Sequence, residues 1–157
     1  MLTIGLLGAL GCATEEAPSS PPTVDAGESD SATISCTGDS RNDTYTPNLE
    51  KAGASGVYRF TLLSATPAPP IRGTNSWSLR VTDATGAVIQ GATIEITPYM
   101  PDHGHGPSVK AAATEESDHS YTVTPLYFFM PGLWQVTFKA SVADKSDTAV
   151  FTFCVEG

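Results

Sequence analysis

Two histidines and two methionines in this chain could together bind a transition metal. Residues 100–106 read Met-Pro-Asp-His-Gly-His-Gly and contain two of the three histidines. Another methionine, Met130, lies about thirty residues later at the start of a Met-Pro-Gly turn. Imidazole nitrogen is a borderline ligand and thioether sulfur is a soft one, and this combination favours copper over calcium or magnesium. The pattern therefore predicts a copper site whose ligands are His103, His105, Met100 and Met130.

The same residues leave the identity and oxidation state of the metal open. Met100 and Met130 suit Cu(I), whereas Asp102 with the two histidines suits Cu(II), and neutral imidazole serves zinc equally well. Gly104 and Gly106 favour a loop, in which the backbone can fold both imidazoles onto one ion. The alternative is a glycine-rich loop whose histidines bond to backbone and whose methionines fill gaps in the core.

Nothing in the sequence predicts catalysis. The chain has no Gly-x-Ser-x-Gly elbow, no His-Glu-x-x-His helix and no phosphate-binding glycine loop. Glu115 and Glu116 are adjacent acids in a polar segment typical of a solvated loop. His119 is interpreted as a solvated loop histidine in the same way. We therefore expect a protein that is not an enzyme.

The start of the chain predicts export. Residues 1–11 form an uncharged apolar run that is too short to span a bilayer, and Cys12 follows. This segment resembles the end of a bacterial lipoprotein signal, which would attach lipid to Cys12 and leave no transmembrane helix. It departs from the usual lipoprotein pattern at Ala9, where that pattern prefers Leu, and no Lys or Arg precedes the apolar run. An ordinary cleaved signal or a misplaced start codon are the alternatives.

A tether is predicted for residues 12–35, which are rich in Pro, Ser, Thr, Gly and acidic residues. The whole chain has a formal net charge of -9. This charge excludes nucleic acid as a partner, because phosphate binding needs clustered Lys and Arg. Solubility is a sufficient explanation for it.

The cysteine count fits an exported domain. Three cysteines are present, and assigning Cys12 to a lipid leaves Cys36 and Cys154 at the two ends of the remaining chain. An oxidising compartment would allow these two to form a disulfide. Two buried free thiols are the alternative.

Residues 36–157 predict one all-β domain. Apolar residues alternate with polar ones in several segments, and turn signals separate these segments. The alternating segments are 58–62, 77–81, 92–96, 121–123, 134–142 and 150–155. A helical turn or two is expected only at 48–54, and turns at 67–70, 83–86, 131–132 and 144–147. The spacing predicts an immunoglobulin-like antiparallel β-sandwich of about seven strands.

A series of motifs runs through this domain in a fixed order. They are Asn75-Ser76-Trp77-Ser78-Leu79-Arg80-Val81-Thr82-Asp83, Gly86, Gly91-Ala92, the segment 100–106, Tyr121 and Met130-Pro131-Gly132-Leu133-Trp134-Gln135-Val136. Over roughly residues 57–155 the series resembles the YtkA-like family of small extracytoplasmic bacterial domains. The resemblance implies an immunoglobulin-like sandwich, often in lipoproteins and often associated with copper handling. The histidine cluster is more distantly similar to CopC-like copper carriers.

Three functions are therefore consistent with the sequence. The first is a copper-binding or copper-delivery lipoprotein of the cell envelope, whose partner would be a copper protein. The second is an envelope assembly module that binds partners through residues 101–107 and 127–129. The third is a structural domain at the cell surface. In each case the membrane is reached only through the lipid anchor.

Overall fold

A computed structural model describes residue 36 and residues 38–157 of the protein. The predicted signal segment (1–11), the predicted lipid attachment at Cys12 and the predicted tether (12–35) lie outside these residues. Within the described part, no helix has the length and apolar character needed to cross a membrane.

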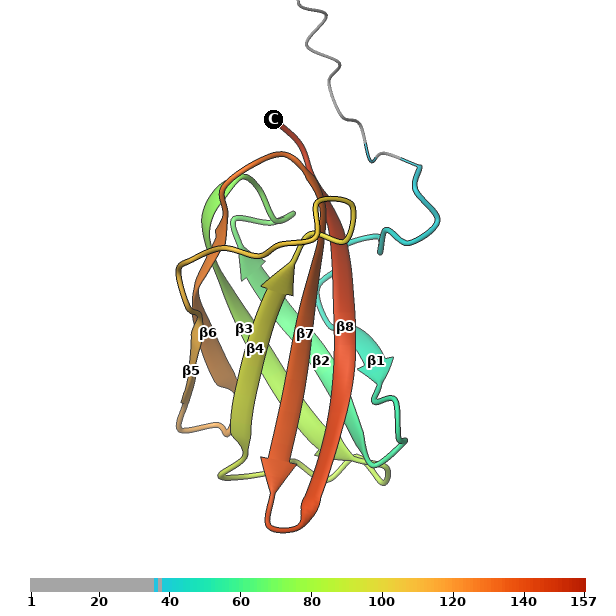
Figure 1. The fold of residues 1–157 in the computed structure, drawn as a ribbon. Coiled ribbons are helices and arrows are strands. Elements are labelled where there is room, and N and C mark those ends of the chain that lie inside the picture. The colour runs from blue at the N-terminus through green and yellow to red at the C-terminus, as the bar shows by residue number, and fades with distance from the viewer. Residues whose placement is uncertain (1–35, 37) are drawn as a thin grey trace, which may run out of the picture. The chain divides into compact units, whose positions relative to one another are not determined.

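The described residues form eight β-strands in two antiparallel sheets, which face each other in Figure 1. One sheet has the order β1-β2-β3-β6-β5 and the other has the order β4-β7-β8. The strands are β1 (Leu49–Ala52), β2 (Tyr58–Thr66), β3 (Gly73–Asp83), β4 (Thr93–Tyr99), β5 (Ala112–Glu115), β6 (Tyr121–Phe128), β7 (Gly132–Val142) and β8 (Lys145–Val155). The predicted all-β sandwich is confirmed.

The strand order is that of an immunoglobulin domain. Constant-type domains pair strands A-B-E-D in one sheet and C-F-G in the other. Here β2, β3, β6 and β5 take the first four places, and β4, β7 and β8 take the other three. Strand β1 is an addition that pairs with β2 at the edge of the larger sheet.

The alternation seen in the sequence becomes a buried face on each sheet. Every second residue along most of β3 and β7 is buried. Trp77 of β3 lies between the sheets, with its ring centroid 5.4 Å from Phe153, 6.0 Å from Phe138 and 6.1 Å from Phe128. Phe153 and Phe138 come from the opposite sheet, so this aromatic cluster packs the two sheets together.

The helical turn predicted for residues 48–54 is wrong. This segment contains strand β1, whose residues pair with β2 from Leu49 opposite Leu62 to Ala52 opposite Arg59. Pairing satisfies the backbone N–H and C=O groups that face β2, and Leu49 packs against the core. The edge of an existing sheet therefore decides the local structure.

The turn predicted for residues 144–147 is shorter than expected. Val142 pairs with Lys145, so only Ala143 and Asp144 form the hairpin loop, and Ala143 adopts a φ of 50°. Asp147 belongs to β8 and is only 3% exposed. Its carboxylate accepts hydrogen bonds from backbone N–H groups, which is why an acid is tolerated in the strand.

The segment before β1 covers the outer edge of β8. The Asp43 N–H donates to the Thr152 C=O at 2.8 Å, and the Asp43 carboxylate accepts the Thr152 N–H at 2.7 Å. The Asn42 side-chain oxygen accepts the Cys154 N–H at 2.8 Å. Cys36 and Cys154 form the predicted disulfide. The segment thus satisfies an edge that would otherwise expose unpaired backbone groups.

Candidate metal site

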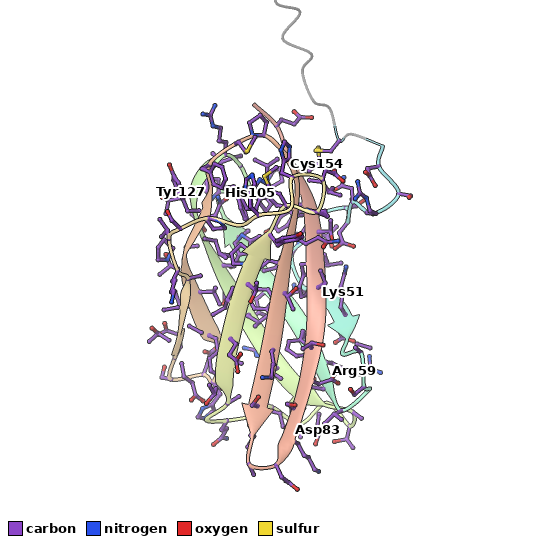
Figure 2. The ribbon with its side chains drawn as sticks, in the orientation of Figure 1. Lys51, Arg59, Asp83, His105, Tyr127 and Cys154 are labelled. Atoms are coloured by element: carbon purple, nitrogen blue, oxygen red, sulfur yellow. A yellow bond between two sulfur atoms is a disulfide. The ribbon has the colours of Figure 1, made fainter. Side chains whose placement is uncertain are left out.

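The candidate ligands lie at one end of the sandwich, where β4 ends and β7 begins. Figure 2 shows His105 at this end, together with Cys154 and Tyr127, whereas Asp83 lies at the opposite end. The structure therefore brings the loop after β4 and the turn before β7 to the same place, as the sequence predicted.

Backbone hydrogen bonds close the loop that carries the histidines. The Met100 N–H donates to the His105 C=O at 2.8 Å, and the His103 and Gly104 N–H groups donate to the Met100 C=O at 3.2 and 2.9 Å. Gly104 adopts a φ of 72°, a conformation that suits glycine. A Cβ at Gly106 would clash with the Pro98 C=O of β4. These contacts give the loop a defined backbone.

His103 and His105 are exposed and lie next to each other. Their ring centroids are 5.8 Å apart, and the ring planes are inclined by 56°. Two imidazoles that bind one ion through nitrogen at about 2.0–2.1 Å have centroids roughly 4.5–6.4 Å apart. The observed separation lies in that range, so the distance between the rings is compatible with a single ion.

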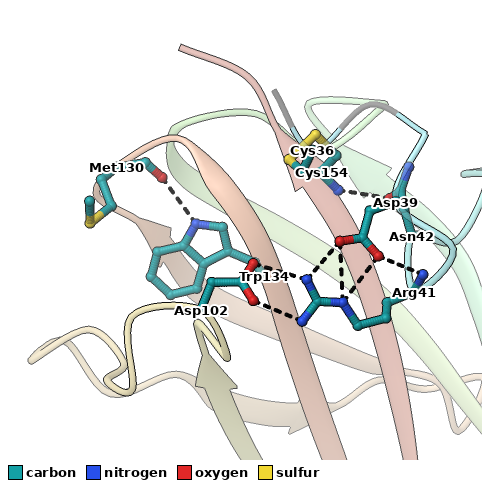
Figure 3. Close-up of a disulfide and its surroundings, with 8 residues drawn as sticks. All are labelled: Cys36, Asp39, Arg41, Asn42, Asp102, Met130, Trp134 and Cys154. Carbon is teal, nitrogen blue, oxygen red and sulfur yellow. Dashed lines mark hydrogen bonds and ion pairs between the residues drawn. A yellow bond between two sulfur atoms is a disulfide. The ribbon is translucent and has the colours of Figure 1, made fainter. Parts of the chain in front are cut away.

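An aromatic contact connects the His105 ring to the segment that carries Met130. The ring stacks on Phe129 with centroids 5.5 Å apart and an angle of 22°. Phe129 in turn packs edge-on against Trp134, at 5.4 Å. The Trp134 indole N–H donates to the Met130 C=O at 3.0 Å, as Figure 3 shows. Met130 is half-buried and packs against the hydrophobic core.

Met100 has a different environment from Met130. It is 0% exposed and belongs to the hydrophobic core. Its methyl group lies close to Gly132, where an added Cβ would be 2.6 Å from it. In this conformation Met100 fills the core beneath the turn before β7, as the alternative interpretation of the methionines expected. Its sulfur would reach an ion at the surface only after the loop opens.

Asp102 is engaged by an arginine that the sequence did not single out. Arg41 donates from Nη1 to Asp102 Oδ1 at 2.8 Å and from Nη2 to Asp102 Oδ2 at 3.0 Å (Figure 3). It also pairs with Asp39, at 2.6 Å. The Arg41 side chain and backbone N–H together lower the pKa of Asp39 to about 2. Arg41 and Asp102 are 61 residues apart, so no local pattern indicated their contact.

The remaining candidates do not join this site. His119 precedes β6 and Phe129 follows it, so they lie at opposite ends of that strand. Glu115 accepts a hydrogen bond from the Gly91 N–H and contacts the His119 ring at 3.0 Å, and both contacts lower the pKa of Glu115. Among the described residues no group of three His, Cys, Asp or Glu side chains could hold a metal ion. Any site here depends on thioether sulfur or solvent beside the two imidazoles.

The surface predicted for partner binding is less apolar than expected. Phe128 is 0% exposed, and its ring packs 5.0 Å from that of Trp134. Phe129 is half-buried beneath His105, and only Tyr127 of the three is exposed. The alternation of β6 explains this result, since Phe128 points to the core and Tyr127 points outward.

Comparison with known proteins gives one result. The family model described as YtkA-like matches residues 52–139. Neither a curated protein nor a solved structure matches the chain. The matched range includes β2 to β6, the histidine loop, Met130 and Trp134.

Proposed function

The chain belongs to the YtkA-like family of extracytoplasmic domains, and from this membership and the histidine geometry we propose that it binds one copper ion for copper handling or delivery. The observation that carries the proposal is the pair of exposed imidazoles, His103 and His105, with centroids 5.8 Å apart. The pair lies on a loop whose backbone is fixed by its own hydrogen bonds, which reduces the ordering cost of binding.

Met130 supplies the third ligand in this proposal. Its neighbour Phe129 stacks on His105, so Met130 belongs to a segment that contacts the histidine loop. Two imidazoles and one thioether form a set that suits Cu(I) well. Met100 becomes a ligand only when the loop opens. In this proposal Cu(II) is held chiefly by the two imidazoles and water.

The proposal also covers location and chemistry. An acylated Cys12 and the acidic segment 12–35 would hold the domain outside the cytoplasm at the cell envelope. The Cys36–Cys154 disulfide is consistent with an oxidising compartment. The protein would present copper to a partner protein and would not catalyse a reaction.

Metal titration of the purified protein tests the proposal. Copper affinity is measured by competition with a chromophoric chelator, in air for Cu(II) and under anaerobic reducing conditions for Cu(I). We expect one equivalent of copper to bind, and the His103→Ala/His105→Ala variant to lose tight binding. Met130→Leu should weaken Cu(I) binding more than Cu(II) binding. His119→Ala is the matched control, because this third histidine lies at the other end of the sandwich.

Two results would contradict the proposal. One is a parent protein that binds no copper, and the other is a double histidine variant that binds copper as tightly as the parent. Thermal melting of each variant shows whether it is folded, and little change is expected because both histidines are exposed. After either result, an envelope interaction or structural module becomes the better interpretation.

A further inference from the structure

We propose that Arg41 determines the metal selectivity of this site by keeping the Asp102 carboxylate away from the ion. The inference rests on the proposed copper site and extends it. Asp102 is adjacent to His103 in the loop, so its carboxylate is a hard ligand that could complete a site with the two imidazoles. A carboxylate would favour Cu(II) and zinc over Cu(I).

Arg41 occupies both oxygens of Asp102. Its two terminal nitrogens lie 2.8 and 3.0 Å from Oδ1 and Oδ2, which is the two-point geometry of a strong guanidinium–carboxylate pair. Asp39 holds the same guanidinium from the other side, at 3.0 Å from Nε and 2.6 Å from Nη2. The guanidinium is therefore oriented by one carboxylate while it binds the other.

The position of Arg41 is fixed by the segment that covers β8. Its chain neighbours Asn42 and Asp43 are bonded to the β8 backbone, and Cys36 is linked to Cys154. Arg41 thus extends from a fixed backbone to the histidine loop. The ion pair is exposed to solvent, with relative side-chain accessibilities of 43% and 50%, so it is an equilibrium that a substitution can shift.

With Arg41 in place, the ligands left for the ion are imidazole and thioether, and a positive charge lies beside them. Loss of Arg41 would free the Asp102 carboxylate and remove that charge. Removal of the positive charge alone would strengthen the binding of every cation, whereas the freed carboxylate would strengthen the binding of the harder ions, Cu(II) and Zn(II), in particular. The ratio of Cu(II) affinity to Cu(I) affinity therefore reports the effect of the carboxylate.

A double-mutant cycle tests the inference. The dissociation constants of the full chain for Cu(II), Zn(II) and Cu(I) are measured for the parent, Arg41→Gln, Asp102→Asn and the double variant. Arg41→Gln should raise the Cu(II)-to-Cu(I) affinity ratio roughly three- to tenfold, because one carboxylate becomes available to the ion. In the Asp102→Asn background the same change should leave this ratio unaltered. Arg59→Gln is the matched control, since it removes another exposed arginine paired with a carboxylate, Glu50.

The outcomes separate this inference from the proposed function. The inference is wrong if the parent binds copper and Arg41→Gln leaves the Cu(II)-to-Cu(I) affinity ratio unchanged, or weakens the binding of all three ions equally. Arg41 then only supports the loop. If neither the parent nor Arg41→Gln binds any of the three ions, the proposed copper site is wrong, and the inference is wrong with it. A gain that persists in the Asp102→Asn background also overturns the role given to the carboxylate.

Discussion

Asp147 offers the sharpest test of how this fold is held together. Its carboxylate is 3% exposed and accepts four backbone N–H groups, from Ser55 and Thr148 on Oδ1 and from Val57 and Tyr58 on Oδ2, at 2.8–3.0 Å. One side chain of β8 thereby ties down the turn between β1 and β2. Replacement by Ala leaves all four donors without their acceptor.

The expected loss can be worked out from these contacts. A buried donor left without a partner costs about 1–3 kcal/mol, and three of these four N–H groups are partly accessible and would regain water. We therefore expect Asp147→Ala to lower the free energy of unfolding by about 3–5 kcal/mol. Such a loss corresponds to a fall in melting temperature of about 10–20 °C. Asp147→Asn should cost somewhat less, because its amide keeps a single oxygen acceptor.

The effect should also depend on pH. Burial raises the pKa of Asp147, but the four backbone hydrogen bonds together lower it more, so the pKa lies below its ordinary value. A carboxyl whose pKa is lowered by folding stabilises the protein above its unfolded pKa of about 3.9. This stabilisation is lost as the pH falls through the lower, folded pKa. The difference between parent and Asp147→Asn should therefore be full at pH 7 and should shrink under strongly acidic conditions.

Urea unfolding followed by tryptophan fluorescence, at pH 7 and in acid, measures both effects. Asp144→Asn is the matched control, because Asp144 is an exposed acid in the same hairpin. The reasoning is refuted if Asp147→Ala stays within about 0.5 kcal/mol of the parent at pH 7, the range of an ordinary surface substitution.

Two further predictions concern the end of the sandwich that carries the candidate site. Cys36→Ser/Cys154→Ser should destabilise the domain by up to ~4.7 kcal/mol, because the disulfide closes a long loop, and should shift metal selectivity as Arg41→Gln does. Two alkylatable thiols in the non-reduced, unfolded parent would contradict this. Trp134→Ala should cost about 3–5 kcal/mol by opening a core cavity, whereas Trp134→Phe should cost far less, as chemical unfolding would measure. Equal losses in the two variants would show that the hydrogen bond to Met130, and not packing, is what matters.

The sequence predicted the strands in which apolar and polar residues alternate over many positions. It did not predict segments whose structure depends on contacts with residues far away in the chain. Strands β3 and β7 show long period-two alternation, and both were expected. Strand β1 has only four residues, and its structure depends on the edge of β2. Asp147 was assigned to a turn because acids are common there, and three of the four N–H groups that make it suitable for a strand come from residues about 90 positions away.

The candidate site follows the same rule. Local spacing was enough to place His103 near His105, and the Pro-Gly turn placed Met130 at the same end. The sequence could not decide whether Met100 is a ligand or a core residue, since its burial depends on how closely Gly132 approaches from the neighbouring strand. The stacking of His105 on Phe129 is also a contact between loops, for which a single sequence contains no periodic signal.

The family match includes the candidate ligands but not the residues proposed to control them. Residues 52–139 contain all four candidate ligands, but they exclude Cys36, Arg41 and the whole of β8. The excluded parts depend on each other, because the segment that carries Arg41 is bonded along the edge of β8. Protection of that edge and control of Asp102 are thus functions of one segment. The ligand set therefore lies in the part shared with the family, whereas the proposed control of selectivity lies in the flanking parts of this chain.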